Sequence, residues 1–164
     1  MSYSILLWLM LAATQALAQS TDTHFSHTVS TSASPQAVWH IWTDVPNWQS
    51  WDKGLKAATL NGPFAVGTTG VLTPDRGPRS KFILTEVIEG KSYTFRTKLP
   101  LGALYVKRLL NVQNGQTAFT HEVWFTGVTK HLFGRVSGRA YRALLPTVMQ
   151  TIQTRAEQQP DQSL

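Results

Sequence analysis

The fold is decided by residues 126–157, TGVTKHLFGRVSGRAYRALLPTVMQTIQTRAE, which join the end of a predicted strand to one long amphipathic helix. Pro146 lies inside the helical pattern and cannot donate to the carbonyl of Arg142, so we expect a kinked or loosened turn there. A lone helix that closes a β-rich chain predicts a sheet wrapped around it. Its apolar stripe is wide enough to line a cavity or a core, and it recurs every four residues at Leu132, Val136, Ala140, Leu144, Val148, Ile152 and Ala156.

Upstream of the helix, a series of segments has the composition of β-strands and is separated by turn residues. In residues 92–99 apolar and polar side chains alternate, so one face meets the interior and the other meets water. Asn114-Gly115 is the strongest hairpin signal, because both residues accept a positive φ. Consecutive hairpins predict an antiparallel meander curled over the terminal helix. The predicted strands are residues 68–73, 81–88, 92–99, 104–112 and 117–126.

The first part of the domain adds one strand and two short helices. Residues 24–31 alternate as a strand, and Ser34 and Pro35 supply the N-cap and the first position of a helix. A second short helix or turn is predicted over residues 46–52. The expected order is therefore a strand, two short helices, about six strands and a long helix, which is an α+β arrangement.

Three places in the sequence resemble one protein superfamily. Residues 32–55, SASPQAVWHIWTDVPNWQSWDKGL, resemble its S-x-x-x-V-W-x-x-x-[ST]-D-x-x-x-W-x-x-W opening, and residues 62–67 resemble its glycine-bounded loop. Residues 133–146 resemble the C-terminal helix of bacterial members. The chain thus resembles the START-like, Bet v 1-like (SRPBCC) superfamily, which includes polyketide cyclases/dehydrases and lipid transport proteins. The resemblance implies a helix-grip fold, in which a curved antiparallel sheet of about seven strands grips the helix around a hydrophobic cavity.

The N-terminal segment has the pattern of a targeting sequence. Residues 5–13 are a short apolar run, and residues 16–18, ALA, form an A-x-A cleavage pattern. No Lys or Arg precedes the run, so a retained membrane anchor and a buried N-terminal helix are the alternatives. The run is too short to span a bilayer as a helix. We expect a signal peptide over residues 1–18, a periplasmic or secreted domain over 19–158 and a polar tail over 159–164.

Composition narrows the chemistry. The chain has no cysteine, which excludes disulfides, thiol nucleophiles and thiolate metal sites, and its five histidines lack a ligand spacing, so no metal or cofactor is expected. The net charge of +6 would suit nucleic acid, but the basic residues are scattered and lack stacking aromatics, so no nucleic-acid partner is expected. We interpret the basic residues as a solvated surface, and the alternative is a weak contact with an anionic membrane surface at Lys130, Arg135, Arg139 and Arg142.

Aromatic and polar side chains on the predicted inner faces are the candidate ligand contacts. Several tryptophans gather in residues 39–51, where core packing is the alternative role of Trp39 and Trp48. The strand register leaves open whether His121 or Glu122 faces inward, or whether the polar member faces water. An inward Glu122 would have a raised pKa and act as an acid or base, whereas His121 would orient a ligand or shuttle a proton. The candidate set is Trp42, Trp51, Tyr93, Phe95, Thr97, His121, Tyr141, Leu144 and Val148.

Three functions fit these observations. A non-enzymatic carrier or sensor of a hydrophobic small molecule or lipid agrees with the apolar helix stripe and with the lack of a nucleophile or metal set. The alternative is an aromatase/cyclase that acts on a polyketide-type substrate, in which one acid-base residue promotes aldol closure and dehydration. Predicted export argues against it, because such cyclases work beside cytoplasmic synthases. A protein-interaction domain with a vestigial pocket is the third possibility.

Overall fold

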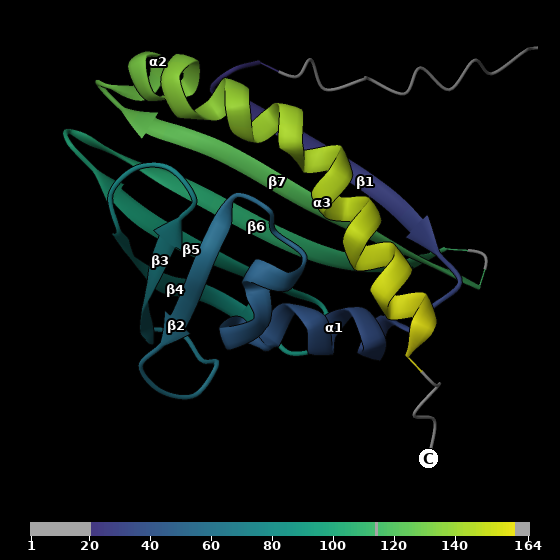
Figure 1. Cartoon of the computed structure of the whole chain (residues 1–164). Helices are drawn as coiled ribbons and strands as arrows, with labels where there is room; N and C mark the ends of the chain where they lie inside the picture. The colour runs from purple at the N-terminus through teal and green to yellow at the C-terminus, as the bar shows by residue number, and fades with distance from the viewer. Residues whose placement is uncertain (1–20, 114, 160–164) are drawn as a thin grey trace, which may run out of the picture.

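Seven antiparallel strands form one curved sheet, and the C-terminal helix lies across its concave face (Figure 1). This computed structural model describes residues 21–113 and 115–159. The strand order across the sheet is β1-β7-β6-β5-β4-β3-β2. The predicted α+β helix-grip fold is therefore confirmed. The strands are β1 (His24–Thr31), β2 (Leu55–Leu60), β3 (Thr69–Pro74), β4 (Ser80–Ile88), β5 (Ser92–Leu99), β6 (Gly102–Gln113) and β7 (Gln116–Gly127).

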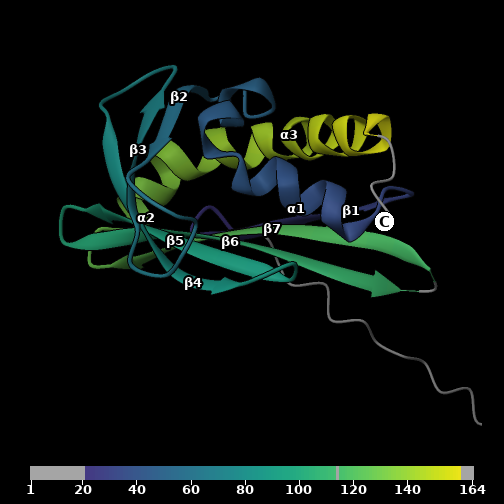
Figure 2. The same ribbon diagram turned by 90° about the horizontal axis from the view of Figure 1, so that it is seen from below.

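Two short helices follow β1, as the sequence predicts. They are α1 (Pro35–Thr43) and the 3-10 helix η1 (Val45–Ser50). The Ser34 hydroxyl accepts a hydrogen bond from the Ala37 amide at 3.3 Å, and Pro35 occupies the first turn. The Trp48 indole donates to the Trp42 carbonyl at 2.8 Å, which ties the two helices together. Both α1 and the C-terminal helix lie on the same side of the sheet (Figure 2).

One edge strand, β2, has no counterpart among the predicted segments. Its sequence, LKAATL, contains two alanines and no clean alternation, so its strand signal is weak. Pairing with β3 creates the strand, with a register shift between Leu55 and Ala57. The strand at this edge therefore depends on tertiary pairing, which local sequence does not encode.

The C-terminal helical segment is divided, and its first half is turned relative to the prediction. It consists of α2 (Lys130–Phe133), a π turn η2 (Gly134–Gly138) and α3 (Arg139–Gln158), which continues through Pro146. Gly134 and Gly138 are buried against the chain before β1, where a Cβ at Gly134 would stand 2.8 Å from the Asp22 carbonyl oxygen. Because only glycine permits this approach, the glycines face inward. Leu132 and Val136, which the predicted stripe placed inward, are consequently exposed. Ala140 and Leu144 of the same stripe, at the start of α3, are exposed as well.

The second half of the helix follows the prediction. Leu145, Val148, Met149, Ile152 and Ala156 are buried against the concave face of the sheet. Together with the aromatic residues of α1, η1 and β5 they form one hydrophobic cluster between the sheet and α3. Among the residues that the structure describes, no helix has the length and apolar character needed to cross a membrane. The predicted signal peptide lies outside the described residues.

Candidate ligand-binding site

Polar side chains cross the middle of the otherwise apolar concave face. Tyr93 on β5 is paired with Arg108 on β6, and Arg108 is paired with His121 on β7. Strand alternation places all three on the inner face, in one row perpendicular to the strands. Tyr141 reaches the row from α3, since its hydroxyl lies 2.9 Å from His121 Nε2. We call these residues, Tyr93, Arg108, His121 and Tyr141, the inner polar cluster.

Hydrogen bonds fix the protonation of the histidine in this cluster. Arg108 Nε donates to His121 Nδ1 at 3.4 Å, and Arg108 Nη1 donates to the Tyr93 hydroxyl. A guanidinium has no acceptor, so His121 Nδ1 must carry the lone pair. The proton of the neutral ring is then on Nε2, which donates to the Tyr141 oxygen. The Tyr141 hydroxyl therefore keeps its own proton for another acceptor.

Aromatic faces surround the Arg108 guanidinium. Its central carbon lies 4.9 Å from the ring centre of Trp48 and 4.8 Å from that of Trp51, with Tyr93 and Phe95 slightly farther away. Arg108 is only 1% exposed. Cation–π contacts of this kind stabilise a charge that water does not reach. Among the described residues, no carboxylate oxygen lies within the 4.0 Å of an ion pair with Arg108.

Burial shifts the pKa values of the interior groups in directions that favour neutral side chains. Desolvation, and then the charge of Arg108, hold the pKa of His121 well below its usual value. Desolvation raises the pKa of Tyr141 and also that of Asp52, the carboxyl group whose charge is felt at Arg108. The Asp52 oxygen Oδ1 accepts a hydrogen bond from the Gly54 amide at 3.0 Å. The interior is thus a low-dielectric site with one strong cation.

Several buried polar atoms near the cluster have no hydrogen-bond partner within the described part of the chain. They are Trp42 Nε1, Trp51 Nε1 and Thr97 Oγ1. A buried donor without a partner costs about 1–3 kcal/mol, so such groups are uncommon in folded proteins. Two of these atoms are indole N–H groups, which can only donate. They are available to the acceptor atoms of a ligand.

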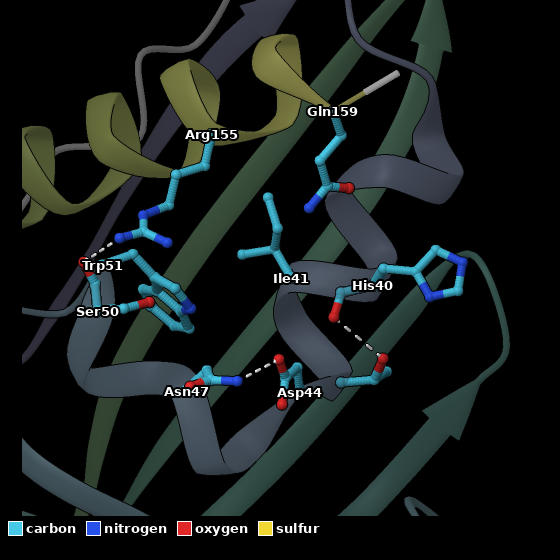
Figure 3. A pocket seen from close by; sticks show the side chains of 9 residues that line it. His40, Ile41, Asp44, Asn47, Ser50, Trp51, Arg155 and Gln159 are labelled. Atoms are coloured by element: carbon cyan, nitrogen blue, oxygen red, sulfur yellow. Dashed lines mark hydrogen bonds between the residues drawn. The ribbon is translucent and has the colours of Figure 1, made fainter. Parts of the chain in front are cut away.

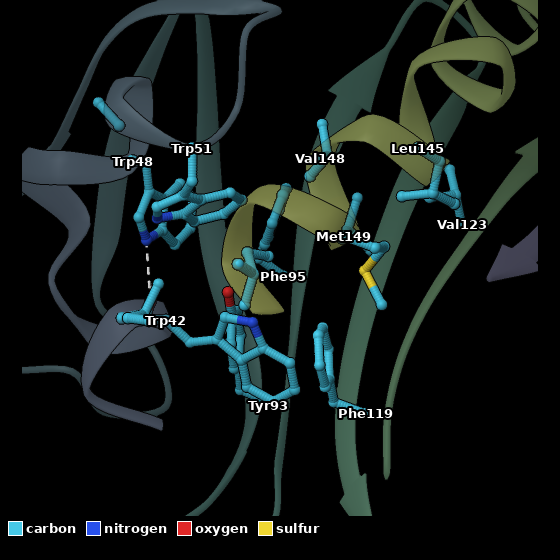
Figure 4. Packing of buried hydrophobic residues seen from close by; sticks show 14 of the residues in the cluster. Trp42, Trp48, Trp51, Tyr93, Phe95, Phe119, Val123, Leu145, Val148 and Met149 are labelled. Carbon is cyan, nitrogen blue, oxygen red and sulfur yellow. Dashed lines mark hydrogen bonds between the residues drawn. The ribbon is translucent and has the colours of Figure 1, made fainter. Parts of the chain in front are cut away.

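Most of the predicted contact residues meet in this interior (Figure 4). Tyr141 is half-buried and joins the cluster, whereas Leu144 is 42% exposed, so its predicted inward position is wrong. A four-residue repeat drifts by about 40° per step around a helix of 3.6 residues per turn, which leaves Leu144 at the edge of the face that Leu145 and Met149 bury. The register places His121 inward, while Glu122 lies on the outer face, 2.6 Å from His24. The buried members of the predicted set are Trp42, Trp51, Tyr93, Phe95, Thr97, His121 and Val148.

Sequence reasoning missed Arg108 and Asp52. The signal for Arg108 was present, because Leu104, Val106, Arg108 and Leu110 occupy alternate positions along β6, so Arg108 shares the inner face with the three apolar residues. Its neighbour Lys107 necessarily faces out. Asp52 has no comparable signal, since it follows η1 in a loop with no period. No group of three potential metal ligands occurs within residues 21–113 and 115–159.

Two surface hollows approach the cluster, each separated from it by aromatic rings. One, of about 460 Å³, lies between α1, η1 and the end of α3, with Trp51 and Ile41 in its wall (Figure 3). The other, of about 560 Å³, is more apolar and is lined by residues that include Trp39, Phe64 and Val87. The Phe64 ring packs edge-on against Tyr93 at 4.9 Å. Phe64 therefore stands between this second hollow, the Phe64 groove, and the inner polar cluster.

A curved sheet that grips a helix around a polar cluster is the architecture of a small-molecule-binding fold. The chain belongs to the polyketide cyclase/dehydrase and lipid transport family, whose pattern matches residues 22–157. This match confirms the membership in the START-like, Bet v 1-like superfamily that the sequence motifs predicted. No curated protein matches the sequence.

Solved structures with the same fold share little sequence with this chain. Protein MLL2253 of Mesorhizobium loti is 15% identical, with a TM-score of 0.67 over 84% of this chain and 98% of that one. Protein jhp0584 of Helicobacter pylori is 12% identical, with a TM-score of 0.69 over 95% and 98%. Norcoclaurine synthase of Thalictrum flavum, in complex with dopamine and hydroxybenzaldehyde, is 13% identical, with a TM-score of 0.63 over 84% and 88%. At these identities the likeness concerns the fold alone.

Proposed function

We propose that the protein binds a hydrophobic small molecule or lipid between the sheet and α3, as a non-enzymatic carrier or sensor. The observation that carries this proposal is the aromatic interior with polar atoms that lack partners, above all the indole N–H groups of Trp42 and Trp51. A solid core of the same size would be more stable without them. A ligand acceptor would satisfy them, and the ligand's apolar body would contact the surrounding rings.

The Phe64 groove is the proposed entrance. Phe64 belongs to the exposed loop at residues 61–68, and the neighbouring side chain of Val66 is 62% exposed. The backbone of this loop is held to the sheet by the Gly67 amide, which donates to the Leu84 carbonyl at 2.8 Å. A movement of the Phe64 ring away from Tyr93 would join the groove to the inner polar cluster without breaking that bond.

Native mass spectrometry of the purified protein, followed by solvent extraction, tests the proposal. We expect a stoichiometric apolar adduct, which extraction removes and a matching compound restores. Phe64→Ala should release and take up the compound several-fold faster, whereas Val128→Ala, at an exposed position outside the groove, should not. A protein that carries no adduct and takes up no member of a panel of fatty acids, sterols and aromatic compounds would contradict a carrier or sensor role.

One observation favours a cyclase-like enzyme as the second candidate. His121 is neutral and contacts the Tyr141 hydroxyl, and such a pair could move a proton during aldol closure. Mass spectrometry of a compound incubated with the protein separates the two functions. Incubation with a synthetic poly-β-ketone would return a compound lighter by the mass of water if the protein catalyses cyclisation and dehydration, and an unchanged compound if it only binds.

A further inference from the structure

We infer that the ligand carries a single carboxylate and that Arg108 binds it at the inner end of the site. The inference rests on the proposed function and adds the chemical class of the ligand. It starts from the state of Arg108, which is the most deeply buried cation of the described chain and has only neutral hydrogen-bond partners. Asp52 influences Arg108 only through its long-range charge. A ligand carboxylate would supply a counter-ion in direct contact with the guanidinium.

A buried cation without a close anionic partner is costly for the fold alone. Taking a charge out of water carries a penalty of several kcal/mol, which only close ion pairs and hydrogen bonds repay. Other arginines of this protein do have carboxylate partners: Arg139 and Arg142 both pair with Asp22, at 3.4 and 3.0 Å. An apolar side chain would fill the position of Arg108 with less penalty. The guanidinium is therefore better explained by a bound anion than by packing.

The surroundings of Arg108 fit a planar monoanion. Trp48 and Trp51 both pack against the guanidinium and restrict its orientation, and a fixed guanidinium binds a carboxylate through two parallel hydrogen bonds. Trp51, whose ring contacts the guanidinium, also carries the unpartnered Nε1 atom, which is a further donor for the ligand. A phosphate ester carries a charge between −1.5 and −2 near neutral pH, by contrast, and would need a second cation. His121 does not supply one, because burial keeps it neutral.

The apolar part of the ligand is expected to extend outward past Tyr93. The Phe64 groove lies beyond that ring, and its walls include Trp39 and Val87. Aromatic walls on one side and a cation at the inner end define a ligand with an aryl or acyl body and a terminal acid. The neutral alcohol of the same skeleton would keep the apolar contacts and lose the charge-assisted hydrogen bonds.

The test compares two fluorescent probes, 1-pyrenebutyrate and its neutral analogue 1-pyrenebutanol, by energy transfer from the protein's tryptophans. We expect the wild-type protein to bind the carboxylate at least about tenfold more tightly than the alcohol, which corresponds to about 1.4 kcal/mol. Arg108→Met should abolish this preference while it still binds the alcohol. Arg108→Gln provides a second neutral variant should the methionine protein fail to fold. Lys107→Met is the matched control, because it removes the adjacent positive charge from the outer face.

The outcomes separate the two proposals. A preference for the carboxylate that Lys107→Met retains and the Arg108 variants lose supports the inference. Equal binding of acid and alcohol by the wild-type protein overturns the inference and leaves the proposed ligand-binding function standing. A carboxylate preference that survives in both Arg108 variants also overturns it, since another cation would then hold the acid. Binding of neither probe overturns the acid-binding site, and failure with the broader compound panel overturns the proposed function as well.

Discussion

Lys107 and Arg108 are neighbours on β6, but their side chains lie on opposite faces of the sheet. One is paired with a carboxylate and the other is surrounded by aromatic rings. The Lys107 amine lies 3.0 Å from a Glu86 oxygen on the outer face, where its side chain is 30% exposed. Arg108 faces the interior, where its charge meets aromatic rings, two tyrosine hydroxyls and a neutral imidazole. The outer cation has both a close counter-ion and water, whereas the inner one is shielded from water and has no carboxylate of the described residues within ion-pair distance.

The two faces therefore serve different purposes. On the outer face, ion pairs such as Lys107 with Glu86 are partly exposed and contribute little to stability. On the inner face, a polar row interrupts an apolar core at a cost to stability. We interpret that cost as the consequence of a binding site. Each of the following comparisons pairs an inner residue with its outer counterpart.

The largest difference is expected for two tryptophans. Trp48 is buried against Phe82 and Phe95, and Trp48→Ala should lower the free energy of unfolding by about 3–5 kcal/mol. Trp124 stacks on Tyr105 of the neighbouring strand, on the outer face, and Trp124→Ala should cost about 1 kcal/mol. Urea denaturation of both variants measures the difference. Equal losses would mean that the outer pair is as important for the fold as the inner cluster.

Two histidines should differ in acid. The pKa of His121 is held well below the usual 6.5 in the folded protein. Just below pH 6.5 the unfolded chain therefore binds a proton at this histidine, whereas the folded protein does not. Stability should therefore fall as the pH drops below about 6.5, by up to about 1.4 kcal/mol per pH unit. His121→Gln should remove this loss. His24→Gln, on the outer face, should change the unfolding free energy by less than about 0.5 kcal/mol. Unfolding curves between pH 7 and pH 5 would contradict this account if the two variants behaved alike.

Two carboxyl groups should respond to pH with opposite sign. Burial raises the pKa of Asp52, so its folded form holds a proton more tightly, and stability falls as the pH rises above about 4. Hydrogen bonds from Lys107 and Thr94 lower the pKa of Glu86, so its contribution is present at neutral pH and lost as the pH falls. Relative to wild type, Asp52→Asn should gain stability from pH 4 to pH 7 and Glu86→Gln should lose it. Parallel trends would refute the assignment.

The smallest effect is expected for Lys107. A partly exposed ion pair contributes up to about 1 kcal/mol, and Lys107→Met should lower the unfolding free energy by no more than this. The effect should also shrink at high salt, because exposed charges are screened. Denaturation at low and at molar salt measures both. A loss of more than about 2 kcal/mol would show that the outer face is not the weakly coupled surface described above.

Much of this arrangement could be predicted from the sequence. The alternation in β5 places Tyr93, Phe95 and Thr97 on one face, and the period of the last helix places Val148 inward. Leu144 was misplaced because the predicted four-residue repeat drifts by about 40° per step around a helix of 3.6 residues per turn, so Leu144 falls at the edge of the buried face. The inward position of the two glycines in the π turn could not be predicted, because their close approach depends on Asp22 far away in sequence. The partners of Arg108 were equally inaccessible, since they depend on pairing among three strands.

The central claim is that Arg108 serves ligand binding and not the fold. The most direct test is urea denaturation of Arg108→Met at pH 7, measured with Asp52→Asn present in both the variant and its reference, so that no buried carboxylate is left unpaired. Replacing buried charges by apolar groups of similar size is often neutral or stabilising by about 1–4 kcal/mol, and we expect the methionine protein to be at least as stable as its reference. A loss of about 3–5 kcal/mol would instead make Arg108 a structural residue and contradict the account.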